Sequence, residues 1–350
     1  MLSSLSRSLV LCQTQRLSTE AVKALLCGGQ TVLTSVAGGR RYYAAEAKPK
    51  KASPIASDGF NGRVAEDSEF KPEPGRYHLY VALGCPWAHR TLIMRKLKGL
   101  EDAVSLNVVD WVLTPEGWKF NAEKPDCTQD TINGKEGMAD IYRMVEPDYK
   151  GAFTVPVLWD KKGSTIVSNS SKDIMHMLNS SFNAFCASPE QRDLDYYPEH
   201  LRDEIDELTG DIQPDLSQGV YKATRAVTQA TYDRAIKKVF ATMDMADNIL
   251  SEKRYLTGDQ LTTIDIGLYT TLIRFDKVYN ALFWCNKKRV TDYKYLWPYL
   301  RELYQMPALR ETTNFHHITH FYYESPKFNK NGLVAVGPDI DFDEPHGRGQ

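Results

Sequence analysis

Hydrophobic and polar residues alternate over residues 77–83, and this period of two predicts a β-strand. Gly84 ends the alternation, and a segment with one apolar face follows over residues 86–98, which predicts an α-helix that starts at a proline. A second strand is predicted over residues 103–110. Strand, helix and strand in this order predict a βαβ unit, so the two strands should be parallel.

A hairpin is predicted further along, from two short apolar runs at residues 153–159 and 164–167. Pro156 follows directly after Thr154-Val155. In thioredoxin-like folds, a proline in this arrangement has a cis peptide bond and lies beside the cysteine. A trans proline on an edge strand is the alternative. Residues 169–173 then predict a helix cap, with the helix running to about Leu178.

The pattern changes after residue 189, where no further strand is predicted and helical periodicity takes over. The fold class is therefore predicted as an α/β thioredoxin-like N-domain followed by an all-α C-terminal domain. Thr262 and Asp265 predict a helix start that resembles a capping box. The amphipathic helical segments are predicted at residues 199–213, 219–250, 263–282 and 292–305.

Composition divides the chain further. A segment rich in Lys, Pro, Ser and Gly predicts an extended arm, ordered only where Phe60 and Phe70 dock. The end of the chain is rich in Asn, Gly, Pro and Asp, so it needs other surfaces to hold it. The predicted parts are 1–43 (presequence), 44–72 (arm), 73–185 (thioredoxin-like domain), 190–325 (helical domain) and 326–350 (C-terminal extension).

The overall charge does not indicate a strongly charged partner. The chain has 350 residues and a formal net charge of −2, which gives no argument for a nucleic-acid partner. No window has the run of apolar residues needed to cross a bilayer, so we expect no membrane insertion.

The first 43 residues are rich in Ser, Thr, Leu and Ala, and their basic residues are offset only by Glu20. This pattern is typical of a mitochondrial presequence and predicts import into the matrix. Residues 41–44 resemble a processing site, which places the mature start near Ala44. A disordered tail that targets nothing is the alternative. The basic residues are Arg7, Arg16, Lys23, Arg40 and Arg41.

No metal site is predicted. The cysteines outside the presequence are too widely spaced for a metal motif or a disulfide framework. His316 and His320 would share one face of a helix, but we expect no carboxylate or cysteine nearby to complete a set of ligands. The four cysteines are Cys85, Cys127, Cys186 and Cys285.

Cys85 stands where the first strand meets the first helix. The free N–H groups and the dipole of a helix N-terminus favour a thiolate, so we predict a reactive Cys85 with a lowered thiol pKa, shielded by Trp87. The alternative is a buried cysteine that only packs. Ala88 occupies the place of the second cysteine of a Cys-x-x-Cys motif, so the thiol that resolves a mixed disulfide must come from outside the motif.

His89 and Arg90 lie in the first turns of the same predicted helix. A cation there opposes the helix dipole, so helix stability explains neither residue. We expect Arg90 to pair with an acidic group elsewhere, and we assign neither residue as a general base.

Motifs spread over about residues 70–348 resemble the xi class of glutathione transferases, the S-glutathionyl-hydroquinone reductases. The resemblance implies glutathione as co-substrate, a quinone-type second substrate, and, by analogy alone, a homodimer. The motifs include Cys85-Pro-Trp-Ala-His-Arg-Thr-Leu-Ile93, Gly117-Trp-Lys-Phe120, Thr154-Val-Pro-Val-Leu-Trp-Asp160, Gly219-Val-Tyr221, Arg274-Phe-Asp276 and Val278-Tyr279.

The chemistry that the resemblance implies is a thiol-dependent reduction. Cys85 attacks the sulfur of a glutathionyl-hydroquinone, the hydroquinone leaves, and a second glutathione frees the cysteine as glutathione disulfide. Tyr221 and one of Tyr322 or Tyr323 match the family's catalytic pair and would donate the proton to the leaving carbon. The alternative is that these tyrosines pack with satisfied hydroxyl groups.

The implied glutathione site is only partly preserved. Ala152 stands where the family has an arginine, and Ser170 stands where it has a glutamate. Thr224 and Arg225 replace a Gly-Phe pair near the substrate pocket. We therefore expect a weakened glutathione site, and the competing interpretation is a mitochondrial scaffold or ligand-binding protein with little turnover. The glutathione-binding positions that do match are Trp118, Val155 and Ser171.

Overall fold

The computed structural model describes residues 59–349, so the predicted presequence and the first part of the arm, residues 44–58, lie outside the described residues. The described end of the arm docks through apolar side chains. Phe70 is buried, and Phe60 packs against two aromatic rings of the adjacent domain. The predicted docking of Phe60 and Phe70 is confirmed.

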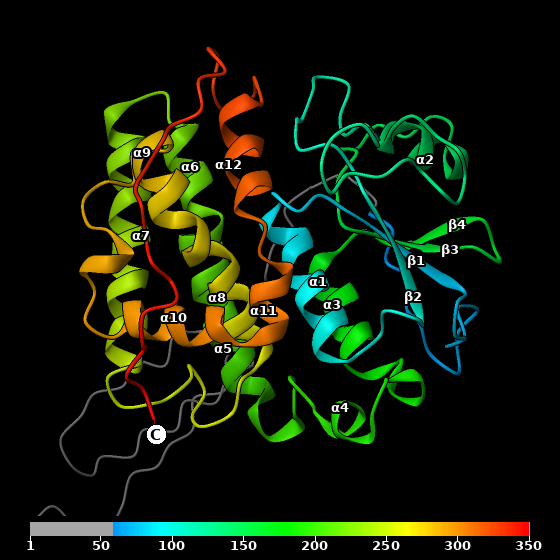
Figure 1. Ribbon diagram of the computed structural model, residues 1–350, viewed down its shortest axis with the longest axis horizontal. Helices are drawn as coiled ribbons and strands as arrows, with labels where there is room; N and C mark the ends of the chain where they lie inside the picture. The colour runs from blue at the N-terminus through cyan, green and yellow to red at the C-terminus, as the bar shows by residue number, and fades with distance from the viewer. Residues whose placement is uncertain (1–58, 350) are drawn as a thin grey trace, which may run out of the picture. The chain divides into compact units, whose positions relative to one another are not determined.

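A mixed sheet of four strands forms the first part of the described chain, in the order β2-β1-β3-β4 (Figure 1). β1 and β2 are parallel, while β3 is antiparallel to β1 and to β4. The predicted βαβ unit and hairpin are both confirmed. The strands are β1 (Tyr77–Val81), β2 (Val104–Val108), β3 (Val157–Asp160) and β4 (Thr165–Ser168).

Helix α1 (Pro86–Leu97) contacts α3 (Ser171–Ser180) (Figure 1). It also contacts two helices of the helical part, α8 (Thr263–Arg274) and α11 (Pro307–Thr312). Because α1 is covered from both sides, eight of the nine residues 86–94 are buried. A short helix, α2 (Met138–Val145), lies in the long connection after β2 and was not predicted. Its eight residues are too few for a clear helical period.

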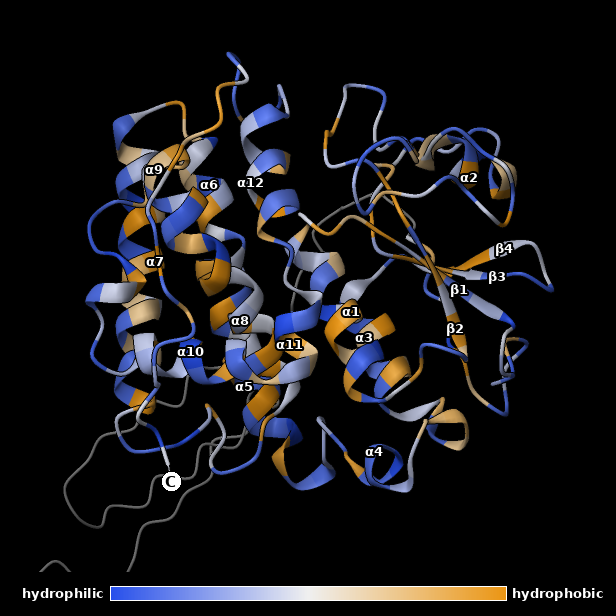
Figure 2. Ribbon diagram, in the orientation of Figure 1, coloured by the Kyte–Doolittle hydropathy of each residue, from blue (hydrophilic) through white to orange (hydrophobic). Residues whose placement is uncertain are grey.

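The helical part follows residue 185, and the described residues contain no further strand. Figure 2 shows apolar residues along the strands and in stripes on helices such as α7 and α8. None of the helices within residues 59–349 has both the length and the apolar character needed to cross a membrane. The helices are α4 (Pro189–Asp193), α5 (Arg202–Ile212), α6 (Gly219–Thr224), α7 (Gln229–Ile249), α8 (Thr263–Arg274), α9 (Asn280–Leu282), α10 (Leu296–Gln305), α11 (Pro307–Thr312) and α12 (Phe315–Glu324).

Two of the predicted helices are interrupted. The segment predicted as one helix over 219–250 is two helices, because Thr228 has an extended backbone and caps the start of α7 with its hydroxyl group. The segment predicted over 263–282 changes to a π-helical turn at Phe275–Tyr279. The second break matters for the site, because Tyr279 lies in the π-helical turn.

The start of α8 is confirmed as a capping box. The Asp265 carboxylate accepts a hydrogen bond from the Thr262 N–H at 2.9 Å. The same buried carboxylate accepts from the Tyr299 hydroxyl of α10 at 2.8 Å. The cap therefore also ties two helices together.

The C-terminal extension is held on α10. Phe342 is buried, and its ring packs against those of Trp297 and Tyr304. Gln305 donates a hydrogen bond to the Phe342 carbonyl at 2.9 Å. The extension thus has the supporting surface that the sequence required.

Candidate active site

Cys85 is the N-cap residue of α1, directly after the turn that follows β1. Its N–H donates to the carbonyl of Ala82 at 3.1 Å, and its own carbonyl accepts from His89 at 3.0 Å. Pro86 occupies the first helical position, where a missing N–H costs nothing. The predicted placement of the thiol at a helix start is confirmed.

The Cys85 thiol is more enclosed than the sequence suggested. Cys85 is 5% exposed, and its sulfur lies 3.8 Å from the carbonyl oxygen of Val155. Burial raises the pKa of Cys85, against the lowering effects of the N–H groups of the first helical turn and of Arg274 and Arg90. The prediction of a lowered thiol pKa was therefore wrong, because the sequence pattern gave the helix start but not the extent of burial.

Arg90 does not have the acidic partner that we expected, since no carboxylate pairs with it among residues 59–349. Its guanidinium lies 4.8 Å from the centre of the Trp87 ring and donates to the Gln213 side chain at 3.2 Å. Burial lowers the pKa of Arg90 to about 10, so it still carries its charge at neutral pH.

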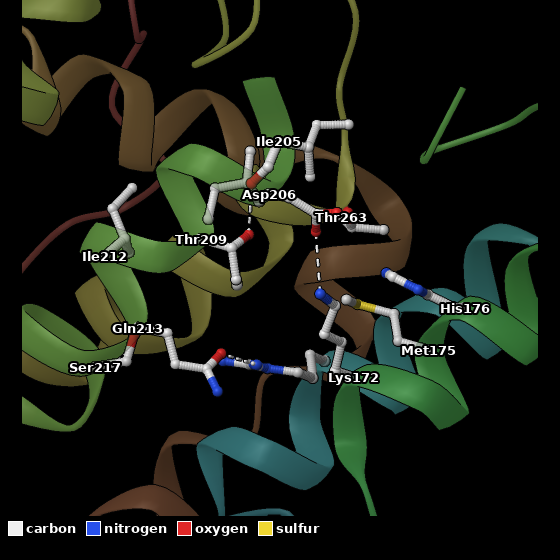
Figure 3. Close-up of a pocket in the computed structure, with 13 residues that line it drawn as sticks. Lys172, Met175, His176, Ile205, Asp206, Thr209, Ile212, Gln213, Ser217 and Thr263 are labelled. Atoms are coloured by element: carbon white, nitrogen blue, oxygen red, sulfur yellow. Dashed lines mark hydrogen bonds and ion pairs between the residues drawn. The ribbon is translucent and has the colours of Figure 1, made fainter. Parts of the chain in front are cut away.

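Gln213 also lines a small cavity beside α1, drawn in Figure 3 with the ion pair between Lys172 and Asp206. The volume of this cavity, about 20 Å³, is close to that of one water molecule. This cavity is far too small for a tripeptide.

Arg274, the last residue of α8, reaches from the helical part to the turn that carries Cys85. It is fully buried and donates to the carbonyls of Leu83 at 3.2 Å and Gly84 at 3.1 Å. Sequence reasoning gave this arginine no role beyond a family motif. A signal was available in the sequence, because Arg274 ends a predicted helix in which residues 266–273 carry no charged side chain.

His89 is held in the neutral form. Its Nδ1 lies 3.1 Å from an Arg274 nitrogen that can only donate, so Nδ1 must accept. Burial, followed by the charge of Arg274, lowers the pKa of His89 well below its usual value. His89 therefore positions Arg274 and does not act as a base for Cys85, as expected from the sequence.

Three tyrosine hydroxyl groups meet in the helical part. The Tyr322 hydroxyl lies 2.6 Å from that of Tyr221 and 2.8 Å from that of Tyr279. Sequence reasoning left Tyr322 and Tyr323 open, and the structure places Tyr322 in the cluster, while the Tyr323 hydroxyl points to the carbonyl of Lys277 at 3.5 Å. Tyr279 was missed as a site residue, because its position depends on the π-helical turn.

The tyrosine cluster has one hydroxyl proton that is not engaged in a hydrogen bond within the cluster. Three hydroxyl groups carry three protons, and the two bonds between them engage two. Burial raises the pKa of all three tyrosines, so they stay protonated at neutral pH. Gly84, directly before Cys85, lies against Phe321, which directly precedes Tyr322. Trp87 and Tyr221 also line one cavity, so the turn that carries the thiol lies next to the helices that carry the cluster.

Comparisons with known proteins identify the family of this chain. Residues 84–181 match the family model described as Glutathione S-transferase, N-terminal domain, and residues 229–302 match the model of the C-terminal domain. The chain is 48% identical to the glutathionyl-hydroquinone reductase YqjG of Escherichia coli over 84% of this chain and 88% of that protein. It therefore belongs to the xi class of glutathione transferases, the glutathionyl-hydroquinone reductase family.

Solved structures of this class agree with the fold. The glutathione-bound structure of Escherichia coli YqjG has a TM-score of 0.80 and 47% identity, covering 83% of this chain and 96% of that chain. The xi-class transferase from Natrialba magadii also has a TM-score of 0.80, with 43% identity, covering 83% and 88%.

The three positions that the resemblance assigns to glutathione lie in separate segments, two in loops and one at the start of α3. Val155 precedes β3 in a cis peptide bond with Pro156 and contacts the Cys85 thiol through its carbonyl. Ser171 begins α3, behind a cap in which Ser170 accepts from a backbone N–H. The buried Trp118 packs its ring on a phenylalanine of α12, with ring centres 5.1 Å apart.

The described residues contain no group of three or more side chains arranged to hold a metal ion. One detail of the sequence argument was wrong, since a carboxylate does lie beside the histidines. Glu324 lies 2.5 Å from His320, and its other oxygen accepts from the Trp111 indole at 2.7 Å. This carboxylate therefore ties α12 to the long connection after β2.

Because burial raises the pKa of Cys85, we expect its alkylation by iodoacetamide to accelerate with pH up to values above about 8.5, the ordinary pKa of a thiol. The thiolate fraction is small at neutral pH and grows as the pH approaches the pKa. The rate should be measured between about pH 6 and pH 10, with Cys85→Ala to subtract the other cysteines. A rate that is already constant below pH 7 would contradict the raised pKa.

Proposed function

We propose that this chain reduces S-glutathionyl-hydroquinones with glutathione through a mixed disulfide on Cys85. Its relatives include the glutathionyl-hydroquinone reductases YqjG and PcpF, the latter from Sphingobium chlorophenolicum and 40% identical over 78% of this chain. The observation that carries the proposal is the close contact of the Cys85 turn with α12, since α12 carries Tyr322, the central hydroxyl of a tyrosine cluster with one proton to spare. The reaction needs both a nucleophile for sulfur and a proton for carbon.

The first half of the reaction uses both groups. The Cys85 thiolate attacks the sulfur of the conjugate, so that an S–S bond forms and the bond between sulfur and the ring carbon breaks. The electron pair passes to the ring carbon, which takes a proton from the tyrosine cluster and leaves as hydroquinone. The cluster recovers its proton from solvent.

The second half requires a thiol from solution. Ala88 occupies the position of a resolving cysteine, and the other three cysteines of residues 59–349 make their hydrogen bonds elsewhere in the fold. The thiolate of a second glutathione attacks the mixed disulfide, and glutathione disulfide leaves. The electron balance closes, because the conjugate is reduced and two glutathione sulfurs end as one disulfide.

Removing the thiol and removing the central hydroxyl should have different effects. Cys85→Ala should abolish reduction of a glutathionyl-hydroquinone, because no other group can form the mixed disulfide. Tyr322→Phe keeps the ring but breaks the hydroxyl chain, and we expect kcat to fall about 10- to 100-fold, near the lower end of general acid effects. Release of hydroquinone and of glutathione disulfide should be followed together.

Two neighbouring residues provide matched controls. Cys127→Ala removes a buried thiol elsewhere in the same domain, and Tyr323→Phe removes a hydroxyl that points away from the cluster. Both variants should keep activity within about twofold. Full activity in Cys85→Ala, or equal losses in Tyr322→Phe and Tyr323→Phe, would contradict the assignment.

We also propose that glutathione is held more weakly than is typical for the family. Its two carboxylates and one ammonium call for fixed charges in a site, and two such residues are replaced here. Ala152 is exposed and carries no charge, and Ser170 uses its hydroxyl group to cap α3. Each lost charge-assisted contact costs about 1.5–3 kcal/mol. The close placement of Cys85 and the tyrosines still favours an enzyme over a scaffold.

Calorimetric titration should therefore give a Kd for glutathione near the millimolar range, about −4 kcal/mol. Ala152→Arg combined with Ser170→Glu should tighten binding by about tenfold or more, because both charges return. Ala152→Arg with Ser170→Ala is the matched control, since it loses the same helix cap without adding a carboxylate. Micromolar binding by the unaltered chain would refute the weakened site.

Two further properties are proposed from the sequence and from the family. The basic, Ser-rich first 43 residues support import into the mitochondrial matrix, and family analogy supports a homodimer. The native protein should begin near Ala44, and light scattering should give about twice the monomer mass. A native protein that keeps Met1, or a clean monomer, would count against the respective proposal.

A further inference from the structure

A second, larger cavity of about 790 Å³ lies beside the catalytic tyrosines, between α1, α6 and α7. This volume suits a small organic ligand. Trp87 and Tyr221 line one part of it, and none of the residues assigned to glutathione by family resemblance does. Its lining contains four cationic side chains and no carboxylate: Lys222, Arg225, Arg234 and Lys238.

Few of these charges are neutralised within residues 59–349. Lys238 pairs with Asp215 at 2.8 Å, and this is the only one of the four with an ion pair in the described part of the chain. Lys222 donates to the backbone carbonyl of Pro214 at 2.7 Å. Three positive charges therefore face the cavity without a negative partner.

Of the four cations that line the cavity, Arg225 lies over the ring of a cluster tyrosine. Its guanidinium lies 5.7 Å from the centre of the Tyr221 ring, and Tyr221 belongs to the hydroxyl cluster. Arg225 is also one of the residues that depart from the family pattern, where a phenylalanine is expected.

Because Tyr221 belongs both to the hydroxyl cluster and to the lining of the cavity, the cavity indicates which part of a substrate would meet these charges. The glutathionyl sulfur must lie at Cys85 and the ring carbon near the tyrosine hydroxyl groups. A substituent on the ring then extends past Tyr221 into the cavity, toward Arg225 and Arg234. Unpaired guanidinium groups bind carboxylates in preference to neutral groups, often through two parallel hydrogen bonds.

We propose that the preferred substrates are glutathionyl conjugates of hydroquinones that carry a carboxylate on the ring. This inference rests on the proposed function and names the substrate class of the same site. The carboxylate takes no part in the bond changes; it orients the ring, so that the carbon bound to sulfur faces the tyrosine hydroxyl groups.

The test compares two conjugates, glutathionyl-hydroquinone and glutathionyl-dihydroxybenzoate, which differ by one ring carboxylate. We expect the unaltered enzyme to favour the carboxylated conjugate in kcat/KM by about tenfold or more, a difference of about 1.4 kcal/mol. Added salt should reduce this preference, because the cavity is open to solvent.

Arg225→Ala with Arg234→Ala should remove most of the preference, lowering the ratio of the two kcat/KM values by about tenfold. Arg225→Lys should retain part of it, since the charge stays but the planar fork is lost. Lys237→Ala is the matched control, because Lys237 is an exposed cation of α7 that does not line the cavity. This control should leave both kcat/KM values and their ratio unchanged.

The outcomes separate this inference from the proposed function. If the unaltered enzyme reduces both conjugates equally well and Cys85→Ala reduces neither, the proposed function stands and the carboxylate preference is wrong. If the arginine variants instead change the KM for glutathione by the same factor with both conjugates, the cations serve glutathione, and the inference is overturned. If neither conjugate is reduced, the proposed function fails and the inference fails with it.

Discussion

The buried guanidinium of Arg274 is the constraint on which the active site depends. It ends α8 in the helical part and binds the backbone carbonyls just before Cys85, without a carboxylate partner in the described chain. A buried charge is tolerated only when its donors are engaged, and here carbonyl oxygens and the neutral His89 engage them. The turn that presents the thiol is therefore held by Arg274, which lies 190 residues after Gly84 in the sequence.

The same turn is pressed against α12. A Cβ atom on Gly84 would lie 2.5 Å from the Cβ of Phe321 and 2.8 Å from the carbonyl oxygen of His317, so only glycine permits this approach. Phe321 is followed directly by Tyr322, the central hydroxyl of the tyrosine cluster. The contact thus sets the thiol and the proton donors on two facing surfaces. A nucleophile from the thioredoxin-like part and an acid from the helical part become one site only because the two parts pack closely.

Local patterns predicted the parts of this structure that depend on local chemistry. Strand alternation, the Cys85–Pro86 helix start and the Thr262 cap were all found from sequence, because each is set by residues a few positions apart. The sequence did not predict three other features, which are the thiol pKa, the partner of Arg90 and the role of Tyr279. Burial of Cys85 comes from covering elements distant in sequence, Arg90 meets a glutamine on another helix, and Tyr279 is positioned by a π-helical turn that has no simple periodicity.

The central claim is that Cys85 carries glutathione during turnover, and intact-protein mass spectrometry tests it most directly. The enzyme should be mixed with a glutathionyl-hydroquinone in the absence of free glutathione, so that the reaction stops after its first half. The account predicts one glutathione on each chain, located at Cys85 by peptide mapping, and one hydroquinone released per chain. Hydroquinone release without an adduct, or an adduct that persists in Cys85→Ala, would contradict it.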